Sequence, residues 1–461
     1  MKTLTKEQAK LILTTALSTG GVFAEIFLED TKAESIEMTS GKVTRTNTSY
    51  VNGASLRIIK GELEVNTSLT NPNFEKLLLA SQKLASNFSD EPTTIVKPFV
   101  DLSHNRHVRI NPKAKEHDVV GLLSKASSAA MEFDSQITQA LGSISKKIQN
   151  ITVYASDGTF AEDIRSNIRL GLTVIASDGK TMQSISDSFG KNQGIDLFDD
   201  FDAIAFGREI ASSALTMLHA DEMVGGEMSV VIHNAFGGVI LHEACGHSLE
   251  ATSVARGLSV FCNKLNQKIA SDIVNAVDDG TEINAWGSIN VDDEGTPTRR
   301  NVLIENGILK SYLVDKRNAM KMKHPITGSS RRESYKYQTT SRMTNTFFLN
   351  GKDKFEDIIA NTKYGLFAKR MGGGSVNPPT GEFNFAVNEG YLIEDGKITK
   401  PVRGATLVGS GKDVLLRIDM IADNLSFGHG MCGSMSGSIP TNVGQPTIRV
   451  SHMTVGGKGG N

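Results

Sequence analysis

Two imidazoles and one carboxylate lie within six residues, in the run His242-Glu243-Ala244-Cys245-Gly246-His247. These groups can bind a metal ion and activate water, so the run predicts a metal-dependent hydrolase. The spacing differs from His-Glu-x-x-His, whose histidines lie one helical turn apart. Residues five apart on a regular helix are rotated by roughly 140°, so we expect a local widening of the π type. Gly246 is expected to make that distortion easier.

A pair of histidines with an acid between them also arises by chance on an ordinary surface helix, and ten histidines occur in this chain. The preceding residues argue against that interpretation. Gly237 to Leu241 contain no charge, which places the ionisable residues that follow at the edge of an apolar core. Buried histidine and glutamate are costly unless they are paired or bound to a metal.

The cysteines supply a candidate for the third ligand. Cys245, Cys262 and Cys432 are the only three, and a sparse, odd set argues against a disulfide framework and for a reducing compartment. Cys432 lies in a stretch rich in glycine and serine, where its thiolate could complete a His-His-Cys set with a fourth zinc position open. The alternative is a small, partly buried thiol without a role. We interpret Cys245 and Cys262 as packing residues.

Several separated segments carry a resemblance to the TldD/PmbA family of metallopeptidases. They are LHEACGHSLE, SRMTNTFF, GEFNFAVNEGYLIEDGKITKPVRGATLVG and CGSMSGSIPTNVGQPTIRVSHMTVGG. The resemblance covers most of the chain, is strongest from about residue 228 onwards, and is to the TldD type of subunit, which bears His-Glu-x-x-x-His. Many such sequences continue with Leu-Glu-Gly-Asp, whereas this chain has Leu249-Glu250-Ala251-Thr252, a difference that bears on substrate preference and partner contacts.

The resemblance implies specific roles. His242, His247 and Cys432 are the zinc ligands that it implies, and Glu243 is the implied general base. It further implies an enclosed site that admits unfolded segments or small peptides. It also implies a dimer, either a heterodimer with a metal-free PmbA-type paralogue or a homodimer.

The expected reaction is therefore hydrolysis of peptide bonds. Zinc would lower the pKa of a bound water and polarise the scissile carbonyl, and Glu243 would carry the proton to the leaving amine. Two alternatives stay open. One is a non-catalytic binding or maturation subunit with a structural metal, and the other is a thiol hydrolase that uses Cys432 with His429.

Other residues near these motifs offer weaker functional interpretations. His429 and His452 flank Cys432 and are possible substitutes for it as ligands. Arg331, Arg332 and Glu333, followed by Tyr335 and Tyr337, could orient a substrate carboxylate or stabilise developing charge near the metal, although a solvated loop is the more ordinary interpretation. Residues 370–375, RMGGGS, lack the ending of a phosphate-binding loop and are interpreted as a turn or as a loop that a peptide backbone can approach.

Length and charge narrow the class of protein. A chain of 461 residues exceeds the usual limit of one hydrophobic core, so two domains are expected. The net charge of −2 and the lack of long basic runs argue against nucleic-acid binding. No segment approaches the eighteen or so apolar residues of a membrane span. The N-terminal segment fits a capped surface helix better than a signal peptide, so cytoplasmic residence is expected.

The hydrophobic pattern predicts an α+β fold with an N-terminal domain over residues 1–222 and a strand-rich domain over residues 223–461 that carries the metal-site helix. Residues 22–70 alternate polar and apolar side chains between Ser40-Gly41, Asn52-Gly53 and Gly61, which predicts an antiparallel meander. Helices are predicted within 74–88, 118–133 and 204–220, and strands within 150–158, 168–179 and 228–232. Asn306-Gly307 and Asp395-Gly396 predict two hairpins.

Overall fold

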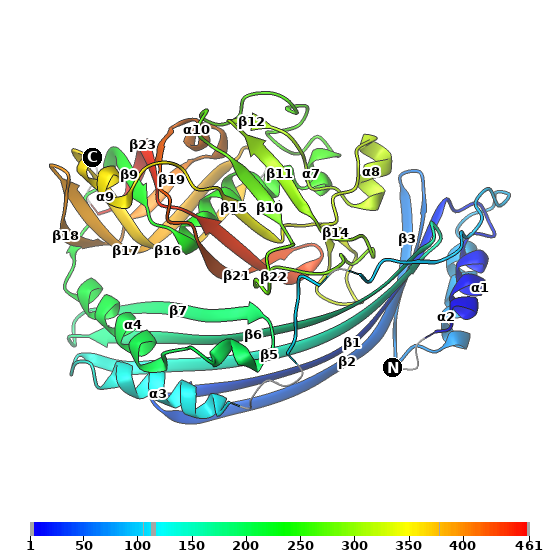
Figure 1. The fold of residues 1–461 in the computed structure, drawn as a ribbon, viewed down its shortest axis with the longest axis horizontal. Helices are drawn as coiled ribbons and strands as arrows, with labels where there is room; N and C mark the ends of the chain where they lie inside the picture. The colour runs from blue at the N-terminus through cyan, green and yellow to red at the C-terminus, as the bar shows by residue number, and fades with distance from the viewer. Residues whose placement is uncertain (1–3, 105, 112–116, 378, 459–461) are drawn as a thin grey trace.

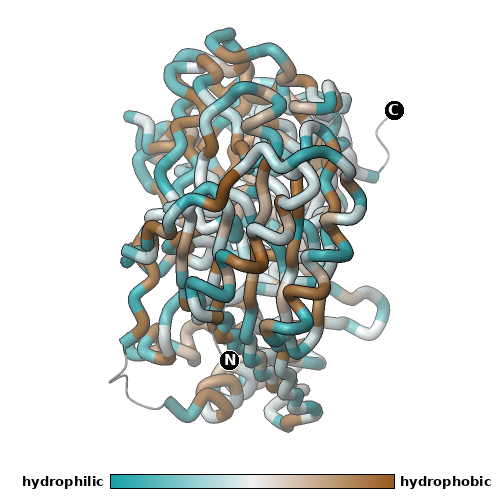
Figure 2. Tube along the Cα trace, turned by 90° about the vertical axis from the view of Figure 1, so that its right-hand side faces the viewer, coloured by the Kyte–Doolittle hydropathy of each residue, from teal (hydrophilic) through white to brown (hydrophobic). Residues whose placement is uncertain are grey.

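The computed structural model describes residues 4–104, 106–111, 117–377 and 379–458. A long curved sheet forms one side of the molecule and a compact, strand-rich lobe lies over it (Figure 1). Strands account for 45% of the chain and helices for 21%, which confirms the predicted mixed α+β class. Hydrophilic and hydrophobic residues alternate along many segments (Figure 2), as expected where one face of a strand is buried.

The N-terminal sheet has seven strands. Six of them follow the order β3-β2-β1-β5-β6-β4, and the seventh, β7, also pairs with β6. All pairings are antiparallel except that of β4 with β6. The predicted meander is confirmed, and its strands are longer than expected. The strands are β1 (Phe23–Thr39), β2 (Lys42–Lys60), β3 (Leu63–Thr70), β4 (Val100–Asp101), β5 (Ile137–Ala155), β6 (Thr159–Ser177) and β7 (Met182–Asn192).

Helices cover the two ends of this sheet, α1 and α2 at one end and α3 and α4 at the other (Figure 1). Thr5 and Gln8 form the predicted capping box of α1. Leu172, Val174 and Ala176, alternate residues of β6, pack with α3 and α4 in one buried cluster. The helices are α1 (Lys6–Ala16), α2 (Phe74–Ala85), α3 (Val119–Met131), η1 (Ile195–Phe198) and α4 (Ala203–Leu218).

One predicted turn of the meander is wrong. Ser40-Gly41 and Gly61 do form turns with left-handed backbone, but Asn52 and Gly53 lie inside β2. A Cβ at Gly53 would lie 2.3 Å from Cε1 of Tyr335. Glycine is therefore required there because a ring from the second lobe packs on the strand, a contact that local sequence cannot reveal.

The second lobe contains two main sheets. One has six strands in the order β12-β11-β10-β15-β22-β21. In the other, β16, β9, β23, β19 and β17 pair in turn and β17 pairs again with β16, so five strands form a closed ring. The strands are β8 (Asp221–Glu222), β9 (Gly226–Ile232), β10 (Ala276–Asp279), β11 (Arg300–Glu305), β12 (Ile308–Leu309), β13 (Ser330–Arg331), β14 (Thr340–Ser341), β15 (Asn345–Phe348), β16 (Tyr364–Asn377), β17 (Glu382–Glu394), β18 (Lys397–Arg403), β19 (Thr406–Ser410), β20 (Ile418–Ile421), β21 (Ser426–Ser434), β22 (Gly437–Gln445) and β23 (Ile448–Gly456).

Short helices connect these strands. They are η2 (Ala235–Gly238), α5 (Val239–Leu241), η3 (His242–Gly246), α6 (His247–Leu249), α7 (Ala251–Val254), α8 (Lys316–Met322), α9 (Phe355–Ala360) and α10 (Gly411–Leu416). Within the described residues, no helix is both long and apolar enough to cross a membrane.

Both predicted hairpins of this lobe are confirmed. Asn306-Gly307 and Asp395-Gly396 have positive φ at both positions, the geometry that a two-residue hairpin turn requires. The interpretation of residues 370–375 as a turn or loop is wrong, because they belong to strand β16. Residues 221–222 pair with β18 of the second lobe, and the boundary placed at residue 222 stays a prediction.

Buried ion pairs join the two lobes. Arg57 of β2 contacts both Glu25, at 2.9 Å, and Glu294 of the second lobe. Arg332 extends this cluster by pairing with Glu25 at 2.9 Å. The suggestion that Arg332 and Arg331 orient a substrate carboxylate is therefore not supported, and a solvated loop is also excluded because each side chain is only 3% exposed.

Candidate metal centre

The structure brings three of the predicted residues together from segments about 190 positions apart. His242 Nε2 lies 3.2 Å and His247 Nε2 lies 3.4 Å from the sulfur of Cys432. The ligand atoms of all three residues lie within 4.8 Å of one another. His242 and Cys432 are buried, and the two imidazole rings are nearly perpendicular, at 85°. Two nitrogens and one sulfur therefore form a compact set of candidate ligand atoms.

A π-turn produces this arrangement. Residues His242–Gly246 form η3, and the backbone N–H of His247 donates to the carbonyl of His242, five residues earlier. The predicted widening of the helix is confirmed. Gly246 has an ordinary helical φ of −53°, so backbone freedom is not what requires glycine. A Cβ there would lie 2.1 Å from the sulfur of Met343, and glycine is required by packing.

Strand β21 supplies the sulfur from an edge of the six-stranded sheet. Cys432 pairs with Ile439 of β22. Burial alone would raise the pKa of the Cys432 thiol, but the charges and hydrogen bonds of His242 and His247 outweigh burial and lower this pKa to about 3. The sulfur is therefore a thiolate near neutral pH, which is the form that binds metals.

Two further residues, which the sequence did not single out, support the ligands. Glu250 contacts His247 Nδ1 at 3.2 Å, so that Nε2 is left to face Cys432. Burial would lower the pKa of His247, but the Glu250 carboxylate, together with Cys432, raises it well above its usual value. Arg342 is completely buried and donates from Nη2 to the carbonyl of Cys432 at 2.6 Å. Its Nε lies 3.7 Å from Glu250 Oε1, so Glu250 and Arg342 connect two ligands.

The donor set fits zinc. Two imidazoles and one thiolate are typical zinc ligands, and tetrahedral zinc with ordinary bond lengths places nitrogen and sulfur ligands about 3.5 Å apart. The sulfur-to-nitrogen distances of 3.2 and 3.4 Å agree with this value. His242 Nε2 faces the Cys432 sulfur at 3.2 Å, so Nε2 is the nitrogen placed to bind. His242 Nδ1 is buried and has no hydrogen-bond partner among the described residues.

Glu243 lies beside the ligands without joining them. Its Oε2 is 3.8 Å from His247 Nε2, and its side chain is 19% exposed. It lines the same cavity as His242, His247 and Cys432. A carboxylate that is partly open to the cavity next to the ligands can exchange protons with a substrate, a capacity that a purely structural site does not need.

The remaining cysteines and histidines lie outside this cluster. Cys245 is fully buried in the apolar core, where burial raises its pKa to about 12, and Cys262 packs half-buried against the same core. His429 packs edge-on against Phe189 and Trp286, and burial lowers its pKa to about 4. His452 is exposed and pairs with Glu227.

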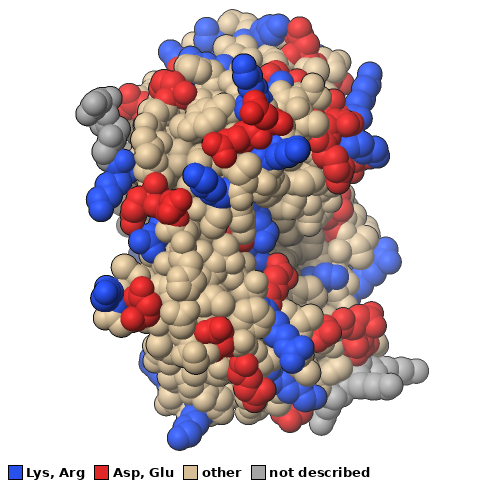
Figure 3. Space-filling view, turned by 90° about the vertical axis from the view of Figure 1, so that its left-hand side faces the viewer, with Lys and Arg blue, Asp and Glu red and all other residues tan. Residues whose placement is uncertain are grey.

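A cavity of about 570 Å³ opens at the candidate ligands, between β16 and β21. It shares lining residues with a larger cavity of about 800 Å³ between the N-terminal sheet and the second lobe. Figure 3 shows the molecule hollowed between its upper and lower parts on one face. The shared lining residues are Phe236, Gly373, Gly430 and Met431. The two cavities therefore adjoin each other beside the candidate metal ligands.

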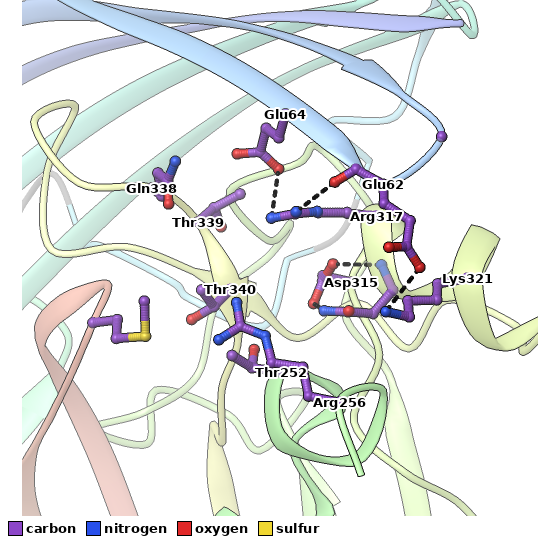
Figure 4. Close-up of a pocket in the computed structure, with 13 residues that line it drawn as sticks. Glu62, Glu64, Thr252, Arg256, Asp315, Arg317, Lys321, Gln338, Thr339 and Thr340 are labelled. Carbon is purple, nitrogen blue, oxygen red and sulfur yellow. Dashed lines mark hydrogen bonds and ion pairs between the residues drawn. The ribbon is translucent and has the colours of Figure 1, made fainter. Parts of the chain in front are cut away.

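A third cavity, of about 250 Å³, lies beside α8 and the β2–β3 turn (Figure 4). Ion pairs occupy its walls, Arg317 with Glu64 at 3.6 Å and Lys321 with Glu62 at 3.0 Å. None of the three candidate metal ligands lines it. The cavity is therefore lined by ion pairs between the two lobes and is separate from the candidate metal ligands.

Comparisons with known proteins agree with the geometry. Residues 225–457 match the family model of the PmbA/TldA metallopeptidase C-terminal domain, residues 111–218 that of the central domain, and residues 24–86 that of domain 1. The chain is 36% identical over 455 residues to a metalloprotease TldD homolog of Haemophilus influenzae, covering 94% of this chain and 93% of that protein.

Two more distant relatives add to this comparison. A zinc metalloprotease TldD homolog of Saccharolobus solfataricus is 28% identical over 63% of this chain and 65% of its own length. The crystal structure of TldE from Thermococcus kodakarensis superimposes with a TM-score of 0.74 at 18% identity, over 94% of this chain and 96% of that one. At that identity the structural match concerns the fold alone.

Proposed function

Because the chain belongs to the TldD/PmbA family of metallopeptidases and is a metalloprotease, we propose that it is a zinc-dependent peptidase that cleaves unfolded or small peptides in the cavity beside Cys432. The observation that carries the proposal is the convergence of His242, His247 and Cys432 within 4.8 Å. These residues would hold a zinc ion, which would polarise the scissile carbonyl and lower the pKa of a bound water.

Glu243 is the general base in this proposal. Its carboxylate is beside the ligands and faces the cavity, so it can accept the proton of the attacking water and pass it to the leaving amine. Glu250 contacts His247 and Arg342 donates to the carbonyl of Cys432, so these two residues hold two of the ligands in position. The thiolate places more negative charge on the ion than a third histidine would, which favours a slow or narrowly directed peptidase.

An extended peptide suits the cavity better than a folded protein does. Strand β21 is an edge strand of its sheet, so a substrate can lie along it as an added strand. The larger cavity between the lobes adjoins the cavity at the ligands, and we expect it to admit an extended chain more readily than a folded domain. We further propose a dimer, either with a metal-free PmbA-type paralogue or with a second copy, which light scattering of the purified chain with and without the paralogue would distinguish.

Glu243→Gln tests the assigned base. The variant should keep its zinc content and lose peptide cleavage, since the ligands are untouched and the proton acceptor is gone. Glu227→Gln, which alters an exposed acid paired with His452, is the matched control and should cleave normally. Full activity of Glu243→Gln would refute the role of this residue and would favour a structural metal.

Chelation tests the metal itself. Removal of zinc should abolish cleavage, and added zinc should restore it. The rival thiol mechanism paired Cys432 with His429, but the sulfur lies against His242 and His247, and His429 contacts Phe189 and Trp286. Activity that survives complete chelation would return the thiol mechanism to consideration.

A further inference from the structure

The larger cavity, between the N-terminal sheet and the second lobe, contains an arginine without a partner. Arg169 of strand β6 lines this cavity. Among the described residues, its guanidinium takes part in no hydrogen bond or ion pair, and its Nε is buried. Buried donors are ordinarily hydrogen-bonded, so an unsatisfied one calls for an explanation. Arginine stays charged in proteins, so the partner that suits this group is an anion.

The other cations of the cavity are neutralised by direct contacts. Lys369 pairs with Glu389 at 2.8 Å. Arg370 pairs with the same glutamate at 3.0 Å and also with Asp187. Burial lowers the pKa of Arg169, and the charge of Asp187 opposes this effect without outweighing it. A further anion beside Arg169 would therefore be stabilised by a charge that the folded chain leaves without a direct contact.

The alternation of strand β6 points Arg169 into the cavity. Leu170 and Leu172 pack into buried clusters with helices α3 and α4, and successive side chains of a strand point to opposite faces of the sheet. Arg169 therefore faces the second lobe. Ser145 of β5 lies directly opposite Arg169 and also lines the cavity, and its hydroxyl can donate a further hydrogen bond to an anion.

Strand β21 connects this part of the cavity to the candidate ligands. His429 of β21 lines the cavity and packs against Phe189, whose neighbour Gly190 pairs with Arg169. Burial, and after it the charge of Arg169, lower the pKa of His429 to about 4, which also indicates that the two side chains are close. His429 precedes Cys432 by three residues in the same strand, or about 10 Å. Arg169 thus lies roughly three extended peptide residues from the candidate metal centre.

We propose that Arg169 is a specificity-determining residue that binds a carboxylate of the peptide substrate, about three residues from the scissile bond. A guanidinium presents parallel N–H donors that match a carboxylate, and such charge-assisted bonds are stronger than neutral ones. The carboxylate is either the C-terminus of the peptide or the side chain of an aspartate or glutamate. The inference rests on the proposed peptidase function and narrows its substrate class to peptides with an acid at this distance.

The test measures peptide binding without turnover. The zinc-loaded Glu243→Gln chain is titrated calorimetrically with short N-acetylated peptides of alanine, serine and glutamine, which carry no charge when the C-terminus is amidated. One set replaces the terminal amide by a free carboxylate, and a second set keeps the amide and replaces one glutamine at a time by glutamate. We expect one of these sets to contain peptides that bind at least tenfold more tightly than the neutral peptide does.

Substitutions of Arg169 then assign this preference. Arg169→Met removes the charge and keeps most of the volume, so it should bind acidic and neutral peptides equally, with the affinity that the parent chain has for the neutral peptide. Arg169→Lys retains the charge without the two parallel donors and should keep part of the preference. Thermal melting shows whether each variant is folded.

Arg208→Met is the matched control. Arg208 is an exposed residue of α4 that does not line the cavity, and its replacement changes the net charge by the same amount. This variant should keep the full preference for acidic peptides.

The outcomes separate the inference from the function. A preference that depends on Arg169 supports the inference, and the set that shows it identifies the carboxylate as terminal or as a side chain. The inference is overturned if the parent chain binds acidic and neutral peptides alike or binds none of them. It is also overturned if Arg169→Met keeps the preference, which would place the carboxylate on the zinc ion, or weakens binding of all peptides equally. The proposed function fails separately, if the zinc-loaded chain with the native Glu243 cleaves no peptide.

Discussion

Replacement of Glu250 tests whether the metal centre depends on residues that do not touch the metal. Glu250 is 5% exposed, and its Oε2 lies 3.2 Å from His247 Nδ1. Its other oxygen lies 3.7 Å from the guanidinium of Arg342, which in turn donates to the carbonyl of Cys432. Glu250→Ala therefore removes support from two of the three ligands at once.

The expected loss follows from this position. Removing the partner of a ligating histidine typically weakens metal affinity 10- to 100-fold, or about 1.4–2.7 kcal/mol. Glu250→Gln retains an acceptor for His247 but loses the charge, so its zinc affinity should fall between those of the wild type and Glu250→Ala. The alanine variant also leaves Arg342 buried without a counter-charge, which typically costs about 3–5 kcal/mol of folding stability.

Competition with a chromophoric zinc chelator gives the affinities, at a temperature where thermal melting shows each variant to be folded. Glu227→Ala provides the control, because it removes an equivalent glutamate–histidine contact, of 2.9 Å, on the exposed surface. Its zinc affinity should not change. If Glu250→Ala binds zinc as tightly as the wild type does, the support that we assign to this carboxylate is wrong.

Two further predictions concern charge. In chelated protein at about pH 5, well below the ordinary cysteine pKa of about 8.5, thiolate absorbance should be present and should vanish in Cys432→Ser but not in Cys245→Ser. Because the pKa of Cys432 is lowered to about 3, its ionisation stabilises the fold fully above the unfolded pKa and progressively less as the pH falls toward 3. Arg57→Met leaves the buried Glu294 carboxylate without its cationic partner and removes one of the two partners of Glu25, which typically costs about 3–5 kcal/mol and should lower the urea midpoint. Arg45→Met, at an exposed site, should leave this midpoint unchanged.

The centre of the site could be predicted because two of its ligands and the candidate base lie close together in the sequence. His242 and His247 are five apart, and only a π-turn brings both rings to one ion, so the distortion could be predicted before the fold was known. The role of Gly246 could not, since its requirement comes from Met343, about 100 residues away. Arg342 was missed for the same reason, since it contacts Cys432 and Glu250 from a distant part of the chain. The role of Glu250 was missed because it depends on the contacts with His247 and Arg342 in the folded chain.

The fold shows the same division. Two-residue turns such as Asn306-Gly307 have a local cause, positive φ at both positions, and were predicted correctly. Asn52-Gly53 carries the same signal but lies within β2, since Tyr335 from the other lobe packs against Gly53. Glycine marks either a turn or a close neighbour, and sequence alone does not distinguish the two.

We interpret the buried Arg342 as a residue that positions the metal ligands. A completely buried guanidinium loses its hydration, and such groups often contribute little net stability. Arg342 nevertheless donates to Ser436 Oγ and to the carbonyl of Gly437 at the β21–β22 turn, and to the carbonyl of Cys432 within β21. Its Nε lies 3.7 Å from Glu250 Oε1. It thereby fixes the strand that carries the sulfur relative to the segment that carries His247. A hydrophobic side chain of similar volume would fill the same space but would leave the distance between sulfur and imidazole unconstrained, and that distance decides whether one ion can be shared.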